Sequence, residues 1–210
     1  QAFFDNVNHE WMQRCLEERI SDRKFIRYIL RMLKSGVMEE GTFLRTDKGT
    51  PQGGVISPVL ANIYLHYVLD LWFQVRIRKE VRGYVEMIRY CDDFIILVEH
   101  EDEAQQILQR LTERLSKFNL HLSEDKTRIV RFGRKAQKEH DEGGPKPGTF
   151  SFLGFTHYCG KGRKGSFKVG RRTEKKRLCR SIQSVKNWLK YNRNTVPLIE
   201  LHARVSSMLI

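Results

Sequence analysis

Asp92 and Asp93 are the residues of this sequence whose chemistry stands out most. They follow Arg89-Tyr90-Cys91 and separate two apolar runs, 84–88 and 94–98, whose aromatic and β-branched composition predicts strands. Because Asp favours turns over strand interiors, we expect a β-hairpin with both carboxylates at its tip. Their mutual repulsion would be relieved by Mg²⁺, which shares its ligand shell with substrate phosphates. The hairpin alone leaves a plain solvated turn as an alternative.

A glycine-rich loop at 48–58 is a second candidate site. Its three glycines and Pro51 let the backbone approach a ligand closely and exclude a regular element. Ser57 is placed to cap a helix whose apolar stripe runs from Leu60 to Val75. A loop that leads into a helix N-terminus suits a phosphate or nucleotide, although an ordinary loop before a core helix has the same pattern.

Basic residues dominate the composition, with 38 Lys and Arg against 25 Asp and Glu and a net charge of +13. This excess predicts a polyanionic partner, and the lack of a spanning apolar run, signal peptide or lipidation motif favours nucleic acid over membrane. The densest cluster falls in a helical region expected from Arg171 to Arg193. It includes Arg171, Arg172, Lys175, Lys176 and Arg180. We expect this region to bind the nucleic-acid backbone, with a solvated helix face as the plainer alternative.

The elements that must position these residues form a mixed α and β pattern in one or two domains. Apolar residues at helical spacing predict helices after Asn8, Ser21 and Asp102, with Asn8 and Ser21 as N-caps. Alternating residues predict strands at 120–123 and 127–132. We also expect a strand at 150–158 that is interrupted by Gly154, and a second strand at 166–169 that pairs back on it after a basic turn. The charged segment 133–149 is expected to be a flexible loop.

The cysteines and the ends of the chain bound the context. Four widely spaced cysteines without a zinc or redox motif fit a reducing compartment. The sequence opens without Met and stops within an apolar helical pattern, so we expect an internal segment of a longer protein.

Five motifs carry a family resemblance. They are Phe3-Phe4-Asp5, Gly49-Thr50-Pro51-Gln52-Gly53, Tyr90-Cys91-Asp92-Asp93, Leu122-x-x-x-Lys126-Thr127 and Phe152-Leu153-Gly154-Phe155. In this order and at this spacing they resemble the reverse transcriptases encoded by bacterial group II introns, over almost the whole chain. The resemblance implies an α+β right-hand polymerase, with a ferredoxin-like antiparallel palm sheet backed by helices. Residues 1–170 would be palm with part of the fingers, and 171–210 the start of a helical thumb.

The resemblance also implies an RNA-directed DNA polymerase that uses two Mg²⁺ ions, or Mn²⁺, to join dNTPs to a primer 3′-hydroxyl. Asp92 and Asp93 match metal ligands. Lys126 matches a lysine that protonates pyrophosphate, with simple phosphate binding as the alternative. The nucleotide pocket would comprise Phe4, Pro51, Gln52, Gly53 and Tyr90, with Phe4 excluding a ribose 2′-hydroxyl. The primer grip would comprise Phe152, Leu153, Gly154 and Phe155.

The implied partners are an RNA template, a DNA primer, dNTPs and intron RNA, in the bacterial cytoplasm. The family's other metal-binding Asp would precede Gln1, so we expect the segment to be inactive alone. One alternative is a maturase-type RNA-binding module without polymerase activity, which would have no need for paired carboxylates. The other is a different bacterial retroelement enzyme, from a diversity-generating, retron or CRISPR-associated system, because these share the Pro-Gln-Gly and Phe-Leu-Gly-Phe motifs.

Overall fold

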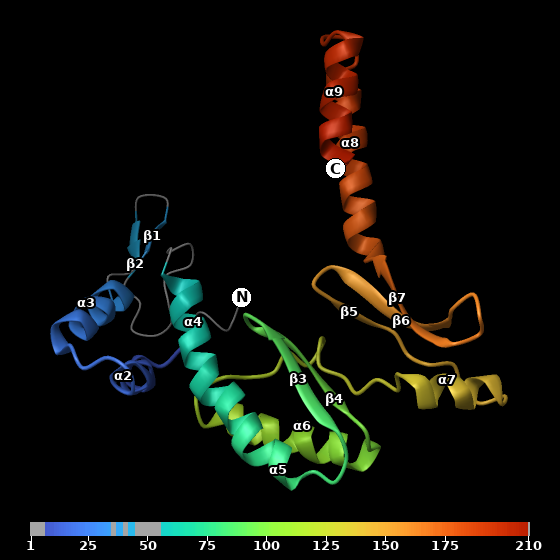
Figure 1. Cartoon of the computed structure of the whole chain (residues 1–210). Coiled ribbons are helices and arrows are strands. Elements are labelled where there is room, and N and C mark those ends of the chain that lie inside the picture. The colour runs from blue at the N-terminus through green and yellow to red at the C-terminus, as the bar shows by residue number, and fades with distance from the viewer. Residues whose placement is uncertain (1–6, 35–36, 40–41, 45–55, 210) are drawn as a thin grey trace. The chain divides into compact units, whose positions relative to one another are not determined.

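The computed structural model describes residues 7–34, 37–39, 42–44 and 56–209, which belong to two units (Figure 1). Unit 1 comprises residues 1–129 and unit 2 comprises residues 130–210. Both combine helices with antiparallel strands, as the sequence predicts. No helix within the described ranges is long and apolar enough to cross a membrane.

Helices dominate unit 1. They are α2 (His9–Glu17), α3 (Arg23–Lys34), α4 (Ser57–Leu65), α5 (Arg78–Glu80), α6 (Glu101–Ser116) and the π-helical turns η1 (His66–Asp70) and η2 (Phe73–Ile77). Asn8 caps α2 as predicted, because its side chain accepts hydrogen bonds from the backbone of Glu10 and Trp11. The predicted Ser21 cap is wrong. Asp22 is the cap residue, since its carboxylate accepts from the N–H groups of Lys24 and Phe25 at 2.8 and 3.2 Å.

The helix expected after the glycine-rich loop is longer than its sequence pattern indicates. It runs without a break through α4, η1, η2 and α5. Ser57 is its first residue and Ile56 takes the cap position predicted for Ser57. Pro58 follows in the first turn, where a missing N–H costs nothing.

Two short hairpins complete unit 1. One consists of β1 (Val37–Glu39) and β2 (Thr42–Leu44), and the other of β3 (Val85–Tyr90) and β4 (Asp93–Val98). The strands expected at 120–123 and 127–132 do not form, because this segment makes a turn in which Lys126 and Thr127 both donate to the Ser123 carbonyl. The described residues hold β3 and β4 as a two-stranded sheet, so the larger ferredoxin-like sheet stays a prediction.

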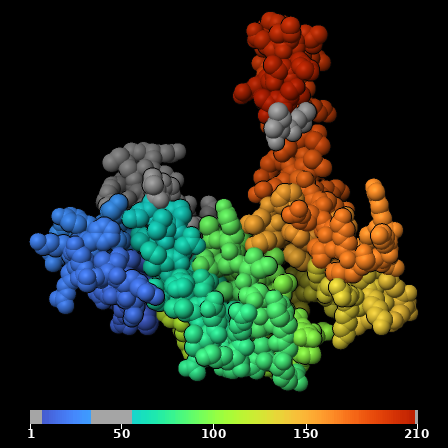
Figure 2. All heavy atoms as spheres, viewed as in Figure 1, coloured from blue at the N-terminus to red at the C-terminus, as the bar shows by residue number. Residues whose placement is uncertain are grey.

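The core of unit 1 lies between its helices and the inner face of β3–β4. The side chains of α2 and α3 form one continuous mass with those of α4 (Figure 2). Tyr64 is fully buried there and donates a hydrogen bond to the Phe118 carbonyl at 3.2 Å. Burial raises its pKa, because the phenolate would lose its hydration. At the end of α6, Asn119 adopts a left-handed φ of 58°, which stops the helix as the sequence predicts.

Unit 2 is a three-stranded sheet followed by a helical hairpin. Its elements are α7 (Arg134–Asp141), β5 (Phe150–Phe152), β6 (Phe155–Lys161), β7 (Phe167–Thr173), α8 (Lys175–Asn192) and α9 (Leu198–Leu209). The strands pair in the order β5-β6-β7, all antiparallel. Phe150 stacks on His157 across the sheet with ring centroids 5.0 Å apart.

Two predictions for unit 2 are wrong in detail, and a third is refined. The expected flexible loop contains α7, whose charged side chains bond within the helix and with Arg131 and Lys161. The strand expected at 150–158 is interrupted at Gly154 as predicted, and the interruption is a turn at Leu153-Gly154 that makes β5 and β6 a hairpin. Arg171 and Arg172 lie on β7 rather than on the basic helix, because β7 continues its ladder with β6 to Thr173.

Candidate active site and nucleic-acid interface

The β3–β4 hairpin places both carboxylates at its tip, which confirms the hairpin predicted from the sequence. Six residue pairs align the strands, from Val85 with Val98 to Tyr90 with Asp93. Cys91 and Asp92 therefore form a two-residue turn. Cys91 adopts φ of 54°, a left-handed conformation that suits such turns but is rare for a residue with a side chain. Strained residues of this kind are often found at functional sites.

The two faces of this hairpin have opposite environments. Val85, Met87 and Arg89 point inward with their partners on β4, and the apolar members pack into the core. On the outer face, Ile88 and Tyr90 are 50% and 62% exposed. Both Asp92 and Asp93 are exposed, so a ligand can reach them without a change in the core.

The carboxylates of Asp92 and Asp93 make no hydrogen bond or ion pair with any residue in the described ranges. Over the same ranges, no group of three or more His, Cys, Asp or Glu side chains forms a complete metal cage. Mg²⁺ often binds through one or two carboxylates and completes its shell with water and phosphate oxygens. The pair at the hairpin tip fits that partial protein shell.

Arg89 is a site residue that the sequence analysis missed. Its guanidinium makes two hydrogen bonds to the Asp70 carboxylate, Nε to Oδ1 at 2.7 Å and Nη2 to Oδ2 at 2.5 Å. Its Nη1 donates to the Asn62 side chain and to the Cys91 carbonyl, both at 2.8 Å. The side chain is only 13% exposed. Two features of the sequence could have indicated the role of Arg89: it is a charged residue at an inward position of a strand, and Asp70 is a charged residue in an otherwise apolar helix.

The π-helical turn η1 brings Asn62 and Asp70 to the same guanidinium. Asn62 and Asp70 are eight residues apart, so on a regular α-helix their side chains would point in directions about 80° apart around the helix axis. The wider π-helical turn rotates less per residue and reduces this angle. Arg114 of α6 supports this turn, because its guanidinium donates to the carbonyls of Val68 and Tyr67 at 3.0 and 3.4 Å. Burial lowers the pKa of Arg114.

The remaining predicted nucleotide-site residues are only partly described. Phe4, Pro51, Gln52 and Gly53 lie outside the described residues. Lys126 belongs to unit 1 and is exposed in the turn that follows Ser123. Its role as a proton donor or phosphate ligand stays a prediction.

The segment predicted to be a primer grip forms the tip of the β5–β6 hairpin. Phe152 pairs with Phe155, and Leu153 and Gly154 have φ of 51° and 82°. Left-handed conformations at both central positions define a type I′ turn. The Gly154 carbonyl accepts from the backbone of Glu174 at 2.9 Å, which ties this tip to the start of α8. Leu153 and Phe155 are 43% and 47% exposed and available for contact.

Unit 2 carries the whole net positive charge of the chain. Residues 130–210 contain 19 Lys and Arg against 5 Asp and Glu, a net charge of +14. Residues 1–129 contain 19 against 20, a net charge of −1. The predicted binding residues are all exposed: Arg171 and Arg172 on β7, and Lys175, Lys176 and Arg180 on α8.

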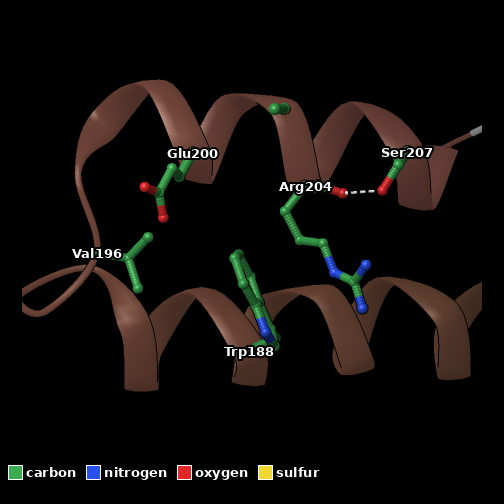
Figure 3. Close-up of a pocket in the computed structure, with 6 residues that line it drawn as sticks. Trp188, Val196, Glu200, Arg204 and Ser207 are labelled. Atoms are coloured by element: carbon green, nitrogen blue, oxygen red, sulfur yellow. Dashed lines mark hydrogen bonds between the residues drawn. The ribbon is translucent and has the colours of Figure 1, made fainter.

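A pocket of about 490 Å³ lies between α8 and α9. Figure 3 shows Trp188 pointing from α8 toward α9, where Glu200 and Arg204 lie on either side of it. The Ser207 hydroxyl donates to the Arg204 carbonyl at 2.8 Å within α9. The pocket lies between two helices of unit 2, and the residues that line it are remote in sequence from the carboxylate pair.

Exposed paired carboxylates on a hairpin, in a chain with a strongly basic unit, are typical of enzymes that act on nucleic acids with divalent cations. A family model, "Reverse transcriptase (RNA-dependent DNA polymerase)", matches residues 1–157. The chain belongs to the reverse transcriptase family. This confirms the family predicted from the five motifs.

Curated relatives narrow the class further. The group II intron-encoded protein LtrA of Lactococcus lactis is 31% identical over 143 residues, 63% of this chain and 24% of LtrA. Protein YkfC of Escherichia coli is 30% identical over 155 residues, 61% of this chain and 41% of YkfC. A 91 kDa protein in the cob intron of Schizosaccharomyces pombe is 41% identical over 83 residues, 40% of this chain and 10% of that protein. The chain thus spans less than half the length of these relatives.

Proposed function

We propose that the protein containing this chain is an RNA-directed DNA polymerase of the group II intron type, with the tip of β3–β4 in its active site. The observation that carries the proposal is the pair of exposed carboxylates of Asp92 and Asp93 at the hairpin tip, which have no hydrogen-bond or ion-pair partner among the residues that the structure describes. Membership of the reverse transcriptase family supports it.

In this proposal, Asp92 and Asp93 would hold divalent cations, Mg²⁺ or Mn²⁺, which would supply positive charge for nucleotidyl transfer. Tyr90 lies on the outer face opposite Asp93 and offers its exposed ring as a surface for the nucleotide or primer end. Lys126 donates a proton to the leaving pyrophosphate or binds its phosphates. Phe4 excludes a ribose 2′-hydroxyl, and Pro51, Gln52 and Gly53 contact the incoming dNTP.

The remaining assignments concern nucleic-acid binding. Unit 2 would guide the RNA template and DNA primer through its basic strand and helix, with Phe152–Phe155 as the primer grip. Residues 1–170 would form palm and part of the fingers, and 171–210 the start of the thumb. The four cysteines are free, which is consistent with the bacterial cytoplasm.

Asp92→Asn tests this proposal in the intact protein. The substitution keeps the shape of the side chain and removes its charge, so primer extension on an RNA template should fall by about three decades or more. RNA binding, measured by fluorescence anisotropy, should stay within about twofold because the basic unit is unchanged. The matched control is Glu113→Gln, which removes one exposed negative charge from α6 and should leave extension unchanged. Robust extension by Asp92→Asn would refute the proposal.

A second candidate function, RNA binding that assists intron splicing, is favoured by the net charge of +14 in unit 2. The resemblance to the intron-encoded LtrA supports the same function. Splicing of the cognate intron RNA in the presence of Asp92→Asn would separate the two activities. Splicing that survives while extension is lost would show that both belong to the protein and depend on different residues.

A further inference from the structure

We propose that Arg89 is a positioning residue for the carboxylate turn, held in place by Asp70 and Asn62. The inference rests on the proposed polymerase function of that turn and extends it to residues that have no part in the chemistry itself. Arg89 acts through the backbone, by fixing the peptide that follows Cys91 and thereby the direction of Asp92.

The geometry favours a brace over an incidental contact. Two nitrogens of the Arg89 guanidinium, Nε and Nη2, form a bidentate pair with the Asp70 carboxylate. This is the strong and directional form of the interaction between arginine and a carboxylate. Its remaining nitrogen, Nη1, donates to Asn62 on α4 and to the Cys91 carbonyl at the hairpin tip. One side chain thus ties the turn to the long helix, and it is part-buried, with 13% of its surface exposed.

The pair with Asp70 also explains how a cation can lie close to the proposed metal ligands without neutralising them. Arg89 is three residues before Asp92, and a free guanidinium there could pair with the carboxylates at the tip. Since Asp70 occupies the guanidinium fork, the carboxylates of Asp92 and Asp93 remain unpaired over the described residues. This leaves their oxygens available for a divalent cation.

The brace has a support of its own. Asp70 closes η1, where Leu71 donates its N–H to the His66 carbonyl five residues back. Arg114 binds two carbonyls of the same turn from α6 and lies over the Phe118 ring at 4.5 Å. A chain of contacts therefore connects α6 to η1, η1 to Arg89, and Arg89 to the carboxylate turn.

Cys91 provides the reason why the turn requires a brace. Its φ of 54° is unfavourable for a residue with a side chain, so the turn has a tendency to relax to other conformations. The hydrogen bond from Arg89 stabilises the observed conformation. Catalysis depends strongly on such placement, because a shift of about 1 Å at a reacting group can reduce the rate by about a hundredfold.

The test uses three variants of the intact protein. Arg89→Lys keeps the charge but loses the planar fork, and Asp70→Asn weakens the partner. Because removing one member of a part-buried pair can destabilise the fold, the third variant is the double substitution Arg89→Met with Asp70→Leu. It replaces both charges by apolar groups of similar size, which is often neutral for stability.

Two readouts separate positioning from a structural role. In primer extension, all three variants should lower kcat by about tenfold to a hundredfold, with the KM for primer–template within about threefold of the wild type. In buffer without metal, hydrogen exchange of the segment 88–95 should accelerate, while exchange in α6 stays unchanged. The double variant should show both effects at an unchanged midpoint of thermal unfolding.

The outcome also distinguishes this inference from the proposed function. If Asp92→Asn is inactive but the double variant keeps wild-type kcat and exchange, Arg89 does not position the turn and the inference is wrong. If Asp92→Asn extends primers normally, the proposed function fails. In that case accelerated exchange at 88–95 would still show that Arg89 holds the turn, and unchanged exchange would overturn the brace as well.

Discussion

Units 1 and 2 distribute burial and charge in opposite ways. Unit 1 is close to neutral and has a large apolar core that joins four of its helices to the β3–β4 hairpin. In the described part of unit 2, the buried hydrophobic side chains are Ala136 and Leu201, and the net charge is +14. A site that must hold carboxylates in fixed positions requires close packing. Attraction of a polyanion requires only a high density of charge at the surface.

The two hairpin tips show the same contrast at the scale of single residues. The tip of β3–β4 holds Cys91 in a left-handed conformation and is braced by the part-buried guanidinium of Arg89. The tip of β5–β6 has glycine at its second turn position and contacts Arg177, whose guanidinium lies against Gly154. The first tip is held by a polar network built into the core, whereas the second follows from its own turn residues.

The largest expected effect is the difference in stability loss when a leucine is replaced by alanine in each unit. Leu111→Ala on α6 removes a side chain that is 3% exposed and should reduce the free energy of unfolding by about 2–5 kcal/mol. Leu178→Ala on α8 removes a side chain that is 48% exposed, and the change should be within about 0.5 kcal/mol. Urea unfolding followed by tryptophan fluorescence measures both. Equal losses would show that α8 is packed as tightly as α6.

Removal of positive charge should affect RNA binding more in unit 2 than in unit 1. Replacing Lys175, Lys176 and Arg180 on α8 with Gln should weaken RNA binding at moderate salt by about tenfold or more. The slope of log affinity against log salt should fall by about two to three, as expected for three lost phosphate contacts. The matched control removes three exposed cations from α3, namely Arg23, Lys24 and Arg27. Similar losses in both triple variants would mean that RNA binding does not reside in unit 2.

Substitution should change the stability of the two hairpin turns differently. Gly154→Ala forces a Cβ into a φ of 82° and should reduce the stability of unit 2 by about 1–2 kcal/mol. Cys91→Gly should leave stability unchanged or slightly higher, because relief of strain is offset by the greater freedom of glycine in the unfolded chain. Hydrogen exchange of each hairpin measures the two effects locally. A large loss from Cys91→Gly would show that the Cys91 side chain, rather than its backbone, stabilises the tip.

The sequence was sufficient for the features that depend on local pattern. The Asp92-Asp93 hairpin, the Asn8 cap and the end of α6 at Asn119 follow from turn chemistry and apolar periodicity, and the structure has all three. It was insufficient where contacts between distant residues decide. The alternation at 120–132 predicts strands, but no described strand pairs with this segment.

The brace at Arg89 belongs to the second kind. Its partners Asn62 and Asp70 precede it by 27 and 19 residues, and their common orientation depends on a π turn that periodicity does not reveal. Charged residues in 133–149 predict a flexible loop by composition, whereas side-chain bonds such as Gln137 with Asp141 stabilise α7. Composition alone does not show which charges will find partners.

The smallest expected effect is a pH dependence that again contrasts the units. Glu103 of unit 1 is buried and accepts a hydrogen bond from the Arg82 backbone at 2.7 Å, which holds its pKa below the ordinary value of 4.5. Asp141 of unit 2 is more exposed, and its bond with Lys161 at 3.0 Å holds its pKa below 3.8. Both groups therefore bind a proton more readily in the unfolded chain than in the folded one.

It follows that each carboxylate contributes its full stabilisation above its ordinary pKa and loses it as the pH falls through the lowered value. Glu103→Gln and Asp141→Asn should each lower the midpoint of thermal unfolding at pH 7, and each difference from the wild type should shrink toward pH 3. Salt separates them, because an ion pair between exposed groups is screened, whereas the bond of the buried Glu103 carboxylate to a backbone N–H is screened much less. At about 1 M NaCl the effect of Asp141→Asn should disappear, whereas that of Glu103→Gln should persist. Loss of both effects in salt would mean that Glu103 is as accessible to water as Asp141, and that the contrast between a packed unit and an electrostatic one does not extend to their carboxylates.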